Sequence, residues 1–306
     1  MTRASARAKL LFGRFRGQGD ATIIETMIVT RFAPSPTGLL HLGHAYAAIT
    51  AYESGDDFLL RIEDIDKGRS RDAFIQAIFY DLKWLGLSWD EPSLRQSTRM
   101  GAYAEALVNL KARGLVYPCF CTRAGIAAEI ARAGEAPHGL QRASSEGPDG
   151  PVYPGTCRAL AHEEGMRRIA AGDSYALRLD VAKAAALTGP LTFLEYGHRH
   201  PVDPLRFGDI VIARKDMPTS YHLAVVVDDA HQQVSLVTRG EDLLVATHIQ
   251  RLLQALLKLP EPSYAHHPLV LDETGKKFSK RDGAVSLESL RQAGATPADI
   301  RARIGL

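Results

Sequence analysis

The sequence has few cysteines, no long apolar run and almost no net charge. Its three cysteines, an odd number clustered between Cys119 and Cys157, do not fit the disulfide framework of a secreted protein and favour a reducing cytosol. No apolar run approaches the roughly 18 residues that a membrane span needs, so we expect no membrane contact. A net charge of +2 permits an anionic partner without requiring one. What remains is an ordinary globular protein, whose 306 residues suffice for one large domain or two moderate ones.

The first 26 residues are rich in arginine and alanine and lack the apolar core of a secretory signal. An arginine-rich, acid-poor start is also typical of a transit peptide, but we expect the first strand to begin at Met27. We therefore expect residues 1–26 to form a disordered extension. Our hypothesis is that Met27 is the first residue of the native protein.

The most informative segment is RFAPSPTGLLHLGH, which runs from Arg31 to His44. Residues 29–32 have the pattern of a strand end, two prolines stiffen the following turn, and residues 45–52 continue as a helix. The first N–H groups of a helix lack internal partners and carry partial positive charge. This junction therefore predicts a phosphate site.

His41, Gly43 and His44 are the predicted nucleotide-binding residues at this junction. The histidine rings can donate N–H groups, and Gly43 lets a ligand approach the backbone. The alternative for so short a motif is an ordinary strand-to-helix turn with surface histidines. The full string of fourteen residues decides against that alternative.

The full string resembles the signature of the glutamyl and glutaminyl branch of class I aminoacyl-tRNA synthetases, with HLGH in the place of the HIGH motif. Further matches to that branch follow in the expected order: FLLRIEDID at 58–66, LKWLGLSWDE at 82–91, YHLAVVVDDA at 221–230, TRGEDLL at 238–244 and KKFSKRDGA at 276–284. Together the matches extend over most of the chain, so chance resemblance is excluded.

The resemblance implies an α/β fold, in which a Rossmann-like, parallel-sheet catalytic domain carries an inserted zinc-containing subdomain and a short helical C-terminal part. We expect the catalytic domain in residues 27–118 and 205–260, the insert in 119–204, and the KFSK loop with the helical part in 261–306. The sequence pattern predicts these elements: strands 58–62, 175–179, 209–213 and 234–238, helices 70–85, 98–111, 220–227 and 243–259, and two short helices between 286 and 304. Only 25 residues follow Arg281, so we expect no anticodon-binding domain.

Activation of an amino acid joins its carboxylate to the α-phosphorus of ATP and expels pyrophosphate, so positioning and charge neutralisation should supply most of the rate. The resemblance assigns Lys277, Ser279 and Lys280 to a mobile loop that binds ATP, with Phe278 in place of a methionine. Mg²⁺ is expected to accompany ATP. A lysine-rich loop by itself is typical of a solvated surface patch, and its pairing with HLGH favours the ATP-binding role.

Glutamate carries one positive and two negative groups, so its pocket needs arginine for a carboxylate and an acceptor for the ammonium group. The resemblance assigns these residues to glutamate: Arg31, Ser35, Glu63, Tyr221 and Arg239. Glu63, which would pair the α-amino group, and Arg239 each lie at the end of a predicted strand, where open α/β sheets bind ligands. The alternative for Glu63 is an ion pair with Arg61, which shares its face of the strand.

The three cysteines suit tetrahedral zinc, which would need one more ligand. The resemblance to the short relatives of glutamyl-tRNA synthetase implies these ligands for one structural zinc ion: Cys119, Cys121, Tyr153 and Cys157. Tyrosine is an uncommon zinc ligand, and the conventional substitutes are His138 and His162. The other alternative is that the cysteines are buried free thiols.

Short members of this branch lack an anticodon-binding domain and transfer glutamate from its adenylate to the cyclopentenediol of queuosine at the wobble position of tRNA(Asp). The resemblance therefore implies L-glutamate, ATP and queuosine-containing tRNA(Asp) as partners. We expect a cytoplasmic monomer. No residue of the sequence displays specificity for queuosine. The alternatives are a truncated synthetase that charges a tRNA acceptor end and a non-catalytic paralogue that retains the fold.

Overall fold

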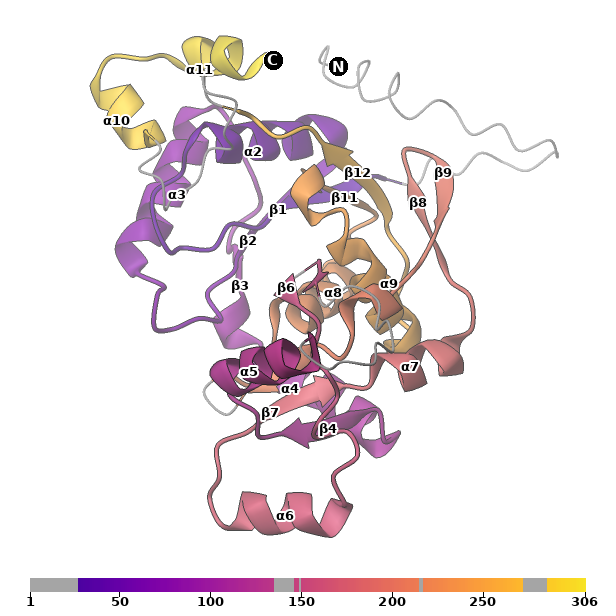
Figure 1. Ribbon diagram of the computed structural model, residues 1–306. Helices are drawn as coiled ribbons and strands as arrows, with labels where there is room; N and C mark the ends of the chain where they lie inside the picture. The colour runs from indigo at the N-terminus through magenta and orange to yellow at the C-terminus, as the bar shows by residue number, and fades with distance from the viewer. Residues whose placement is uncertain (1–26, 135–145, 149, 215–216, 272–284) are drawn as a thin grey trace, which may run out of the picture.

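The computed structural model describes residues 27–134, 146–148, 150–214, 217–271 and 285–306 (Figure 1). The predicted extension at 1–26 and the predicted ATP-binding residues Lys277, Ser279 and Lys280 lie outside the described residues. No helix in the described part of the chain is both long enough and apolar enough to cross a membrane.

Two sheets form the central layer of the molecule. The first sheet consists of parallel strands in the order β1 (Val29–Phe32), β2 (Asp57–Ile62) and β3 (Leu94–Arg95). The second sheet has the order β11 (Leu236–Gly240), β12 (Ser263–His267), β8 (Thr192–Glu195) and β9 (His198–Pro201), parallel except for the β8–β9 hairpin.

Strands β1 and β11 lie side by side where the two sheets meet (Figure 1). The N–H of Ser235 donates to the carbonyl of Val29 at 3.0 Å, and the last residues of the two strands, Phe32 and Gly240, line the same pocket. The carboxyl ends of β1, β2 and β11 therefore share one edge, on either side of the point where the order of strands changes direction. Open α/β sheets bind their ligands at this position.

The helices α2 (Leu42–Ser54) and α3 (Asp72–Trp84) form the first hydrophobic core with β1 and β2. Helix α2 packs on β1 and β11 through small residues such as Ala45 and Ala48, which allow a close approach. Helix α3 buries an apolar stripe at helical spacing. The C-terminal helices α10 (Leu287–Gln292) and α11 (Pro297–Ile304) close the same core.

A second core supports the other half of the central layer. Its helices are α4 (Met100–Ala112), α7 (Val181–Thr188), α8 (Tyr221–His231) and α9 (Ala246–Leu257). A small antiparallel sheet of order β10 (Val211–Arg214), β7 (Ala176–Leu179) and β4 (Val116–Cys119) shares this core. Helices α5 (Arg123–Gly134) and α6 (His162–Ala170) flank the small sheet, with α6 farthest from the central layer (Figure 1).

The remaining elements of the described residues are short. They are β5 (Glu146–Gly147), β6 (Gly150–Pro151) and the 3₁₀ helices η1 (Gln96–Thr98), η2 (Leu205–Phe207) and η3 (Glu241–Leu243).

The predicted parallel α/β layer and the two short C-terminal helices are confirmed. The β8–β9 hairpin was not predicted, because β8 (TFLE) has two adjacent apolar residues instead of an alternation and β9 (HRHP) is polar and exposed along its whole length. The hairpin lies within the predicted insert of residues 119–204, yet it bonds to β12 of the central layer. The division of the chain into two domains stays a prediction.

Candidate active site

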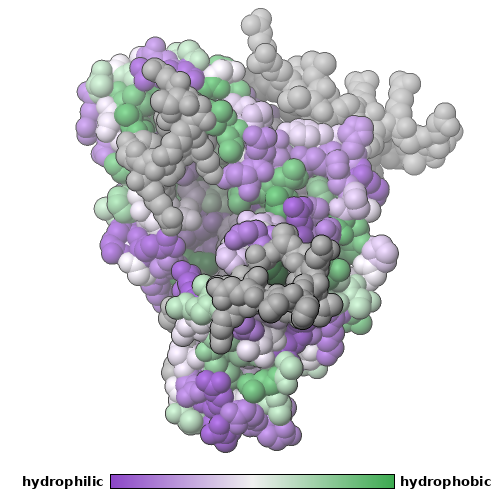
Figure 2. Space-filling model, viewed as in Figure 1, coloured by the Kyte–Doolittle hydropathy of each residue, from purple (hydrophilic) through white to green (hydrophobic). Residues whose placement is uncertain are grey.

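A pocket of about 570 Å³ lies at the carboxyl ends of β1, β2 and β11. The pocket is lined by all five residues that the sequence assigned to glutamate, which are Arg31, Ser35, Glu63, Tyr221 and Arg239. His44 also lines it. On the face drawn in Figure 2 the surface is recessed between the part that carries α2 and α3 and the part that carries α5. The strand ends thus bring together side chains that are up to 208 residues apart, since the set runs from Arg31 to Arg239 (239 − 31).

The two histidines of HLGH build the start of α2. Nδ1 of His41 accepts the N–H of Gly43 at 3.2 Å, and the N–H of His41 donates to Nδ1 of His44 at 3.2 Å. Because each Nδ1 acts as an acceptor, each neutral ring carries its proton on Nε2. His41 and His44 can therefore offer Nε2–H groups at a helix N-terminus, where anions are favoured.

Gly43 is needed for a reason that the sequence did not reveal. A Cβ atom at this position would lie 3.1 and 3.2 Å from atoms of the His41 ring, so a larger residue would push on that ring. His41 itself is almost fully buried, whereas His44 lines the pocket. The glycine thus preserves the histidine cap of α2.

Arg31 is held by a buried carboxylate. Its Nε donates to Oδ1 of Asp229 at 3.0 Å, and Nη2 of Arg61 donates to the same oxygen at 2.6 Å. Burial would raise the pKa of Asp229, but the two guanidinium groups hold that pKa below its usual value. Arg61 also donates from Nε to Gln232 at 2.7 Å. Arg31, which lines the pocket, thus shares one buried aspartate with a second arginine behind it.

Glu63 follows β2 directly and is oriented by its own backbone, whose N–H donates to the carbonyl of Pro34 at 3.1 Å. Desolvation raises the pKa of Glu63 to about 7, and the positive charges of Arg61 and Arg31 only partly oppose the shift. In the described part of the chain the carboxylate partner of Arg61 is Asp229, so the alternative of an Arg61–Glu63 ion pair is wrong.

Arg239 is buried in the opposite wall and is held by uncharged acceptors. Nε donates to Nε2 of His266 at 3.0 Å, Nη1 to Gln250 at 2.8 Å and Nη2 to Thr247 at 2.8 Å. A longer contact of 3.5 Å joins Nη1 to the hydroxyl of Tyr221, at the start of α8. Among the described residues no carboxylate lies within the 4.0 Å of an ion pair with Arg239. The pocket therefore contains a buried cation that lacks a direct counter-charge.

The sequence did not reveal Asp229 and His266, which contact the predicted residues Arg31 and Arg239, and it offered Arg61 only as a partner of Glu63. Asp229 lies in the YHLAVVVDDA match, where two adjacent aspartates end an apolar run. A charged pair on the buried side of a helix is a signal, because buried carboxylates are rare unless they are paired. The partners themselves could not be read from the sequence.

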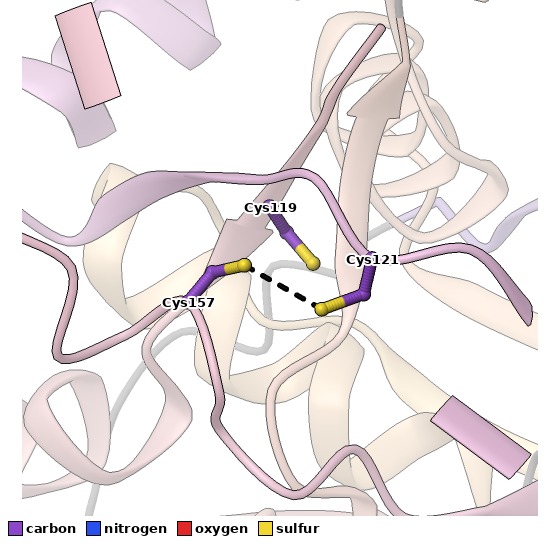
Figure 3. A group of neighbouring side chains, drawn as sticks. All are labelled: Cys119, Cys121 and Cys157. Carbon is purple, nitrogen blue, oxygen red and sulfur yellow. Dashed lines mark hydrogen bonds between the residues drawn. The ribbon is translucent and has the colours of Figure 1, made fainter. Parts of the chain in front are cut away.

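The three thiols of the predicted metal site converge at the end of β4 (Figure 3). The sulfur atoms of Cys119, Cys121 and Cys157 all lie within 4.8 Å of one another, and those of Cys121 and Cys157 are 3.5 Å apart. The hydroxyl of Tyr153 lies 3.5 Å from the sulfur of Cys121 and accepts the N–H of Cys157 at 2.8 Å.

This arrangement fits a tetrahedral ion. Bonds of about 2.3 Å from zinc to sulfur place neighbouring sulfur atoms about 3.8 Å apart. The Tyr153 hydroxyl contacts a thiol directly, whereas His162 starts the exposed helix α6 and His138 lies outside the described residues. The site can hold a metal with little rearrangement.

The pocket, the histidine-capped helix and the parallel sheet define a class of protein. The family described as tRNA synthetases class I (E and Q), catalytic domain, matches residues 27–306. The chain therefore belongs to this family. A glutamate tRNA ligase from Elizabethkingia meningosepticum, solved in complex with its amino acid, superposes with a TM-score of 0.66 at 27% identity and covers 84% of this chain. The chain spans about half of that protein, 53% of its length.

Several proteins with similar sequences match this chain over most of its length. The glutamyl-Q tRNA(Asp) synthetase of Rhodobacter capsulatus is 50% identical over 291 residues, which cover 91% of this chain and 100% of the relative. That of Symbiobacterium thermophilum is 42% identical over 89% of this chain and 83% of the relative. The glutamate--tRNA ligase of Aquifex aeolicus is 39% identical over 88% of this chain but only 55% of its own length.

Proposed function

We propose that this protein activates L-glutamate with ATP and transfers it to the cyclopentenediol of queuosine at the wobble position of tRNA(Asp). The observation that carries the first step is Arg239, a buried cation that lines the pocket without a carboxylate partner among the described residues. The second step is supported by the similarity, over nearly the whole chain, to relatives named glutamyl-Q tRNA(Asp) synthetase.

Glutamate fits the charges of the pocket. The guanidinium groups of Arg31 and Arg239 would bind its carboxylate oxygens, and Ser35 and Tyr221 would add hydroxyl donors. Glu63 would accept the ammonium group. We expect this arrangement of charges to discriminate against glutamine, because its amide brings no negative charge to the buried arginine. Leaving that cation unpaired in the complex is unfavourable.

ATP would lie at the start of α2. The Nε2–H groups of His41 and His44 and the helix N-terminus would bind its phosphates, with Lys277, Ser279 and Lys280 from the KFSK loop. Mg²⁺ bound with ATP would neutralise phosphate charge. A carboxylate oxygen of glutamate forms a bond to the α-phosphorus while the bond from that phosphorus to the bridging oxygen breaks, and pyrophosphate leaves.

The transfer step needs only a hydroxyl nucleophile. A ring hydroxyl of queuosine attacks the carbonyl carbon of the adenylate and loses its proton to solvent, and AMP leaves with the electrons of the broken C–O bond. Positioning rather than covalent help from the protein suffices for this step.

Amino-acid-dependent ATP–pyrophosphate exchange and labelled-glutamate transfer test the two steps together. We expect exchange with glutamate but not with glutamine or aspartate, and transfer to queuosine-containing tRNA(Asp) only. Transfer to tRNA(Glu) would instead support a truncated synthetase that charges an acceptor end. Absence of exchange with every amino acid would support a non-catalytic paralogue.

Glu63 gives the activation step a pH dependence. Since its pKa is about 7, the side chain is neutral below that pH and anionic above it. Only the anion pairs with the ammonium group, so the KM for glutamate is expected to fall as the pH rises from about 6 to 8. Exchange assays across this range measure it. In Glu63→Gln the KM should be high at every pH, whereas Glu53→Gln, at the half-buried ion pair with Arg301, should follow the wild-type profile. A pH-dependent fall of KM in Glu63→Gln would refute this assignment.

We also propose a structural zinc ion bound by Cys119, Cys121, Cys157 and Tyr153. It would tie the end of β4 to the segment that carries Tyr153 and Cys157. Metal analysis of the purified protein is expected to find one zinc per chain, and Cys119→Ala to lose it. Chelation should lower the thermal unfolding midpoint of the wild type but not that of the variant. Wild-type protein without zinc, prepared in zinc-containing medium, would contradict the proposal.

A further inference from the structure

Arg239 is connected to a carboxylate through a histidine. Glu195, at the end of β8, accepts two hydrogen bonds from His266 of β12: the backbone N–H at 2.9 Å and ring Nδ1 at 2.8 Å. On the other side of the ring, Nε2 of His266 faces Nε of Arg239 at 3.0 Å. The three side chains form a continuous buried chain that ends in the pocket.

The partners fix the position of each proton. A carboxylate only accepts, so Nδ1 of His266 carries the proton, and the guanidinium of Arg239 only donates, so Nε2 must be the lone-pair nitrogen. Burial and the charge of Arg239 lower the pKa of His266, which keeps the ring neutral at neutral pH. The hydrogen bond from His266 holds the pKa of Glu195 below its usual value, so this carboxyl stays ionised.

We propose that Glu195 and His266 are positioning residues for glutamate recognition, which hold Arg239 oriented toward the substrate without neutralising it directly. A carboxylate placed on Arg239 itself would form an ion pair that the substrate would have to displace. The carboxylate of Glu195 is separated from Arg239 by the ring of His266. Its negative charge stabilises the buried cation, while the terminal nitrogens of Arg239 stay available for the substrate. This inference rests on the proposed activation of glutamate.

Arg239 has enough N–H groups to bind a substrate carboxylate in addition to its protein partners. A guanidinium has five N–H groups, and the short bonds to His266, Gln250 and Thr247 use three of them. Both terminal nitrogens therefore keep one further N–H. Among the described residues, only the N–H groups of Nη1 have a further hydrogen-bond contact, the long one of 3.5 Å to Tyr221. Two N–H groups on adjacent nitrogens match the two oxygens of a carboxylate.

Two substitutions of His266 distinguish a role in orienting Arg239 from a role in the stability of the fold. His266→Leu removes the acceptor for Nε of Arg239, and the KM for glutamate is expected to rise about tenfold or more with the KM for ATP unchanged. In His266→Gln the side-chain oxygen can replace Nε2, so most of the affinity for glutamate should return. His198→Leu, on the exposed strand β9, is the control and should match the wild type. Equal KM values for glutamate in wild type and His266→Leu would overturn the proposal.

A second pair of variants tests the carboxylate. In Glu195→Gln the amide can accept from only one of the two donors of His266, so the KM for glutamate should rise about tenfold. Glu261→Gln, which disturbs the surface pair with Arg251, should leave it unchanged. Thermal unfolding of every variant confirms that folded proteins are compared, and an unchanged KM in folded Glu195→Gln would count against the relay.

The proton positions can be tested without any activity. Nitrogen-15 NMR of histidine-labelled wild-type protein, with His266 assigned by its absence from His266→Gln, should show Nδ1 protonated and Nε2 unprotonated. A proton on Nε2 would overturn the relay even if glutamate is activated. Conversely, wild-type protein that has Nδ1 of His266 protonated but does not activate glutamate would contradict the proposed function. It would still support the hydrogen-bond chain from Glu195 through His266 to Arg239.

Discussion

Replacing Arg239 with leucine is expected to raise the KM for glutamate in ATP–pyrophosphate exchange about a hundredfold or more. Two charge-assisted hydrogen bonds to the substrate carboxylate would be lost, each contributing about 1.5 to 3 kcal/mol. The acceptors that now hold Arg239, including His266 and Gln250, would also be left without a donor in a buried site.

Arg239→Lys is the matched variant for this experiment. Lysine keeps the charge but cannot reach His266, Gln250 and Thr247 with one planar group while also presenting two N–H groups to a carboxylate. We expect its KM to lie between those of wild type and Arg239→Leu. The KM for ATP should stay near the wild-type value in both variants. If Arg239→Leu bound glutamate as wild type does, the assignment of this pocket to glutamate would be wrong.

Replacing Asp229 with asparagine is expected to lower the free energy of unfolding by about 3 to 5 kcal/mol, because it leaves a buried cation pair uncompensated. The side chains of Arg31 and Arg61 are 5% and 0% exposed, so water cannot solvate the guanidinium groups once the carboxylate is gone. Urea denaturation followed by circular dichroism measures the change.

Asp173→Asn is the control for Asp229→Asn. Asp173 pairs with Arg168 at the surface, where exposed ion pairs contribute about 1 kcal/mol or less. Arg31 lines the pocket, so the Asp229 variant should also bind glutamate more weakly. Equal stability of the two variants would show that Asp229 does not compensate the arginine pair.

The strand–turn–helix of RFAPSPTGLLHLGH could be predicted because its signals are local. Two prolines, a helix start and a strand end all lie within fourteen residues, and the structure has β1, the turn and α2 in that order. The gathering of Arg31, Glu63 and Arg239 could also be predicted, since parallel strands end at one edge of a sheet. Convergence of the three thiols followed from the resemblance, and the structure brings them together.

The residues that support the site could not be predicted, because their partners are distant in sequence. Asp229 lies 198 residues from Arg31, and Glu195 lies 71 residues from His266. Nothing local specifies these pairs: one joins β1 to helix α8, and the other joins β8 to β12 within the second sheet. The β8–β9 hairpin, which carries Glu195, also lacks the apolar alternation of a strand. The local sequence pattern thus predicted the residues proposed to bind the substrate. The residues that support them, such as Asp229 and Glu195, are brought into place only by tertiary packing.

The position of glutamate on the tRNA distinguishes transfer to queuosine from charging of the acceptor end. Queuosine-containing tRNA(Asp) is incubated with the protein, ATP and labelled glutamate, then cleaved with a nuclease that separates the anticodon fragment from the 3′-terminal adenosine. We expect label on the anticodon fragment and none when guanosine replaces queuosine. Label on the 3′-terminal adenosine, or equal label on tRNA without queuosine, would contradict it.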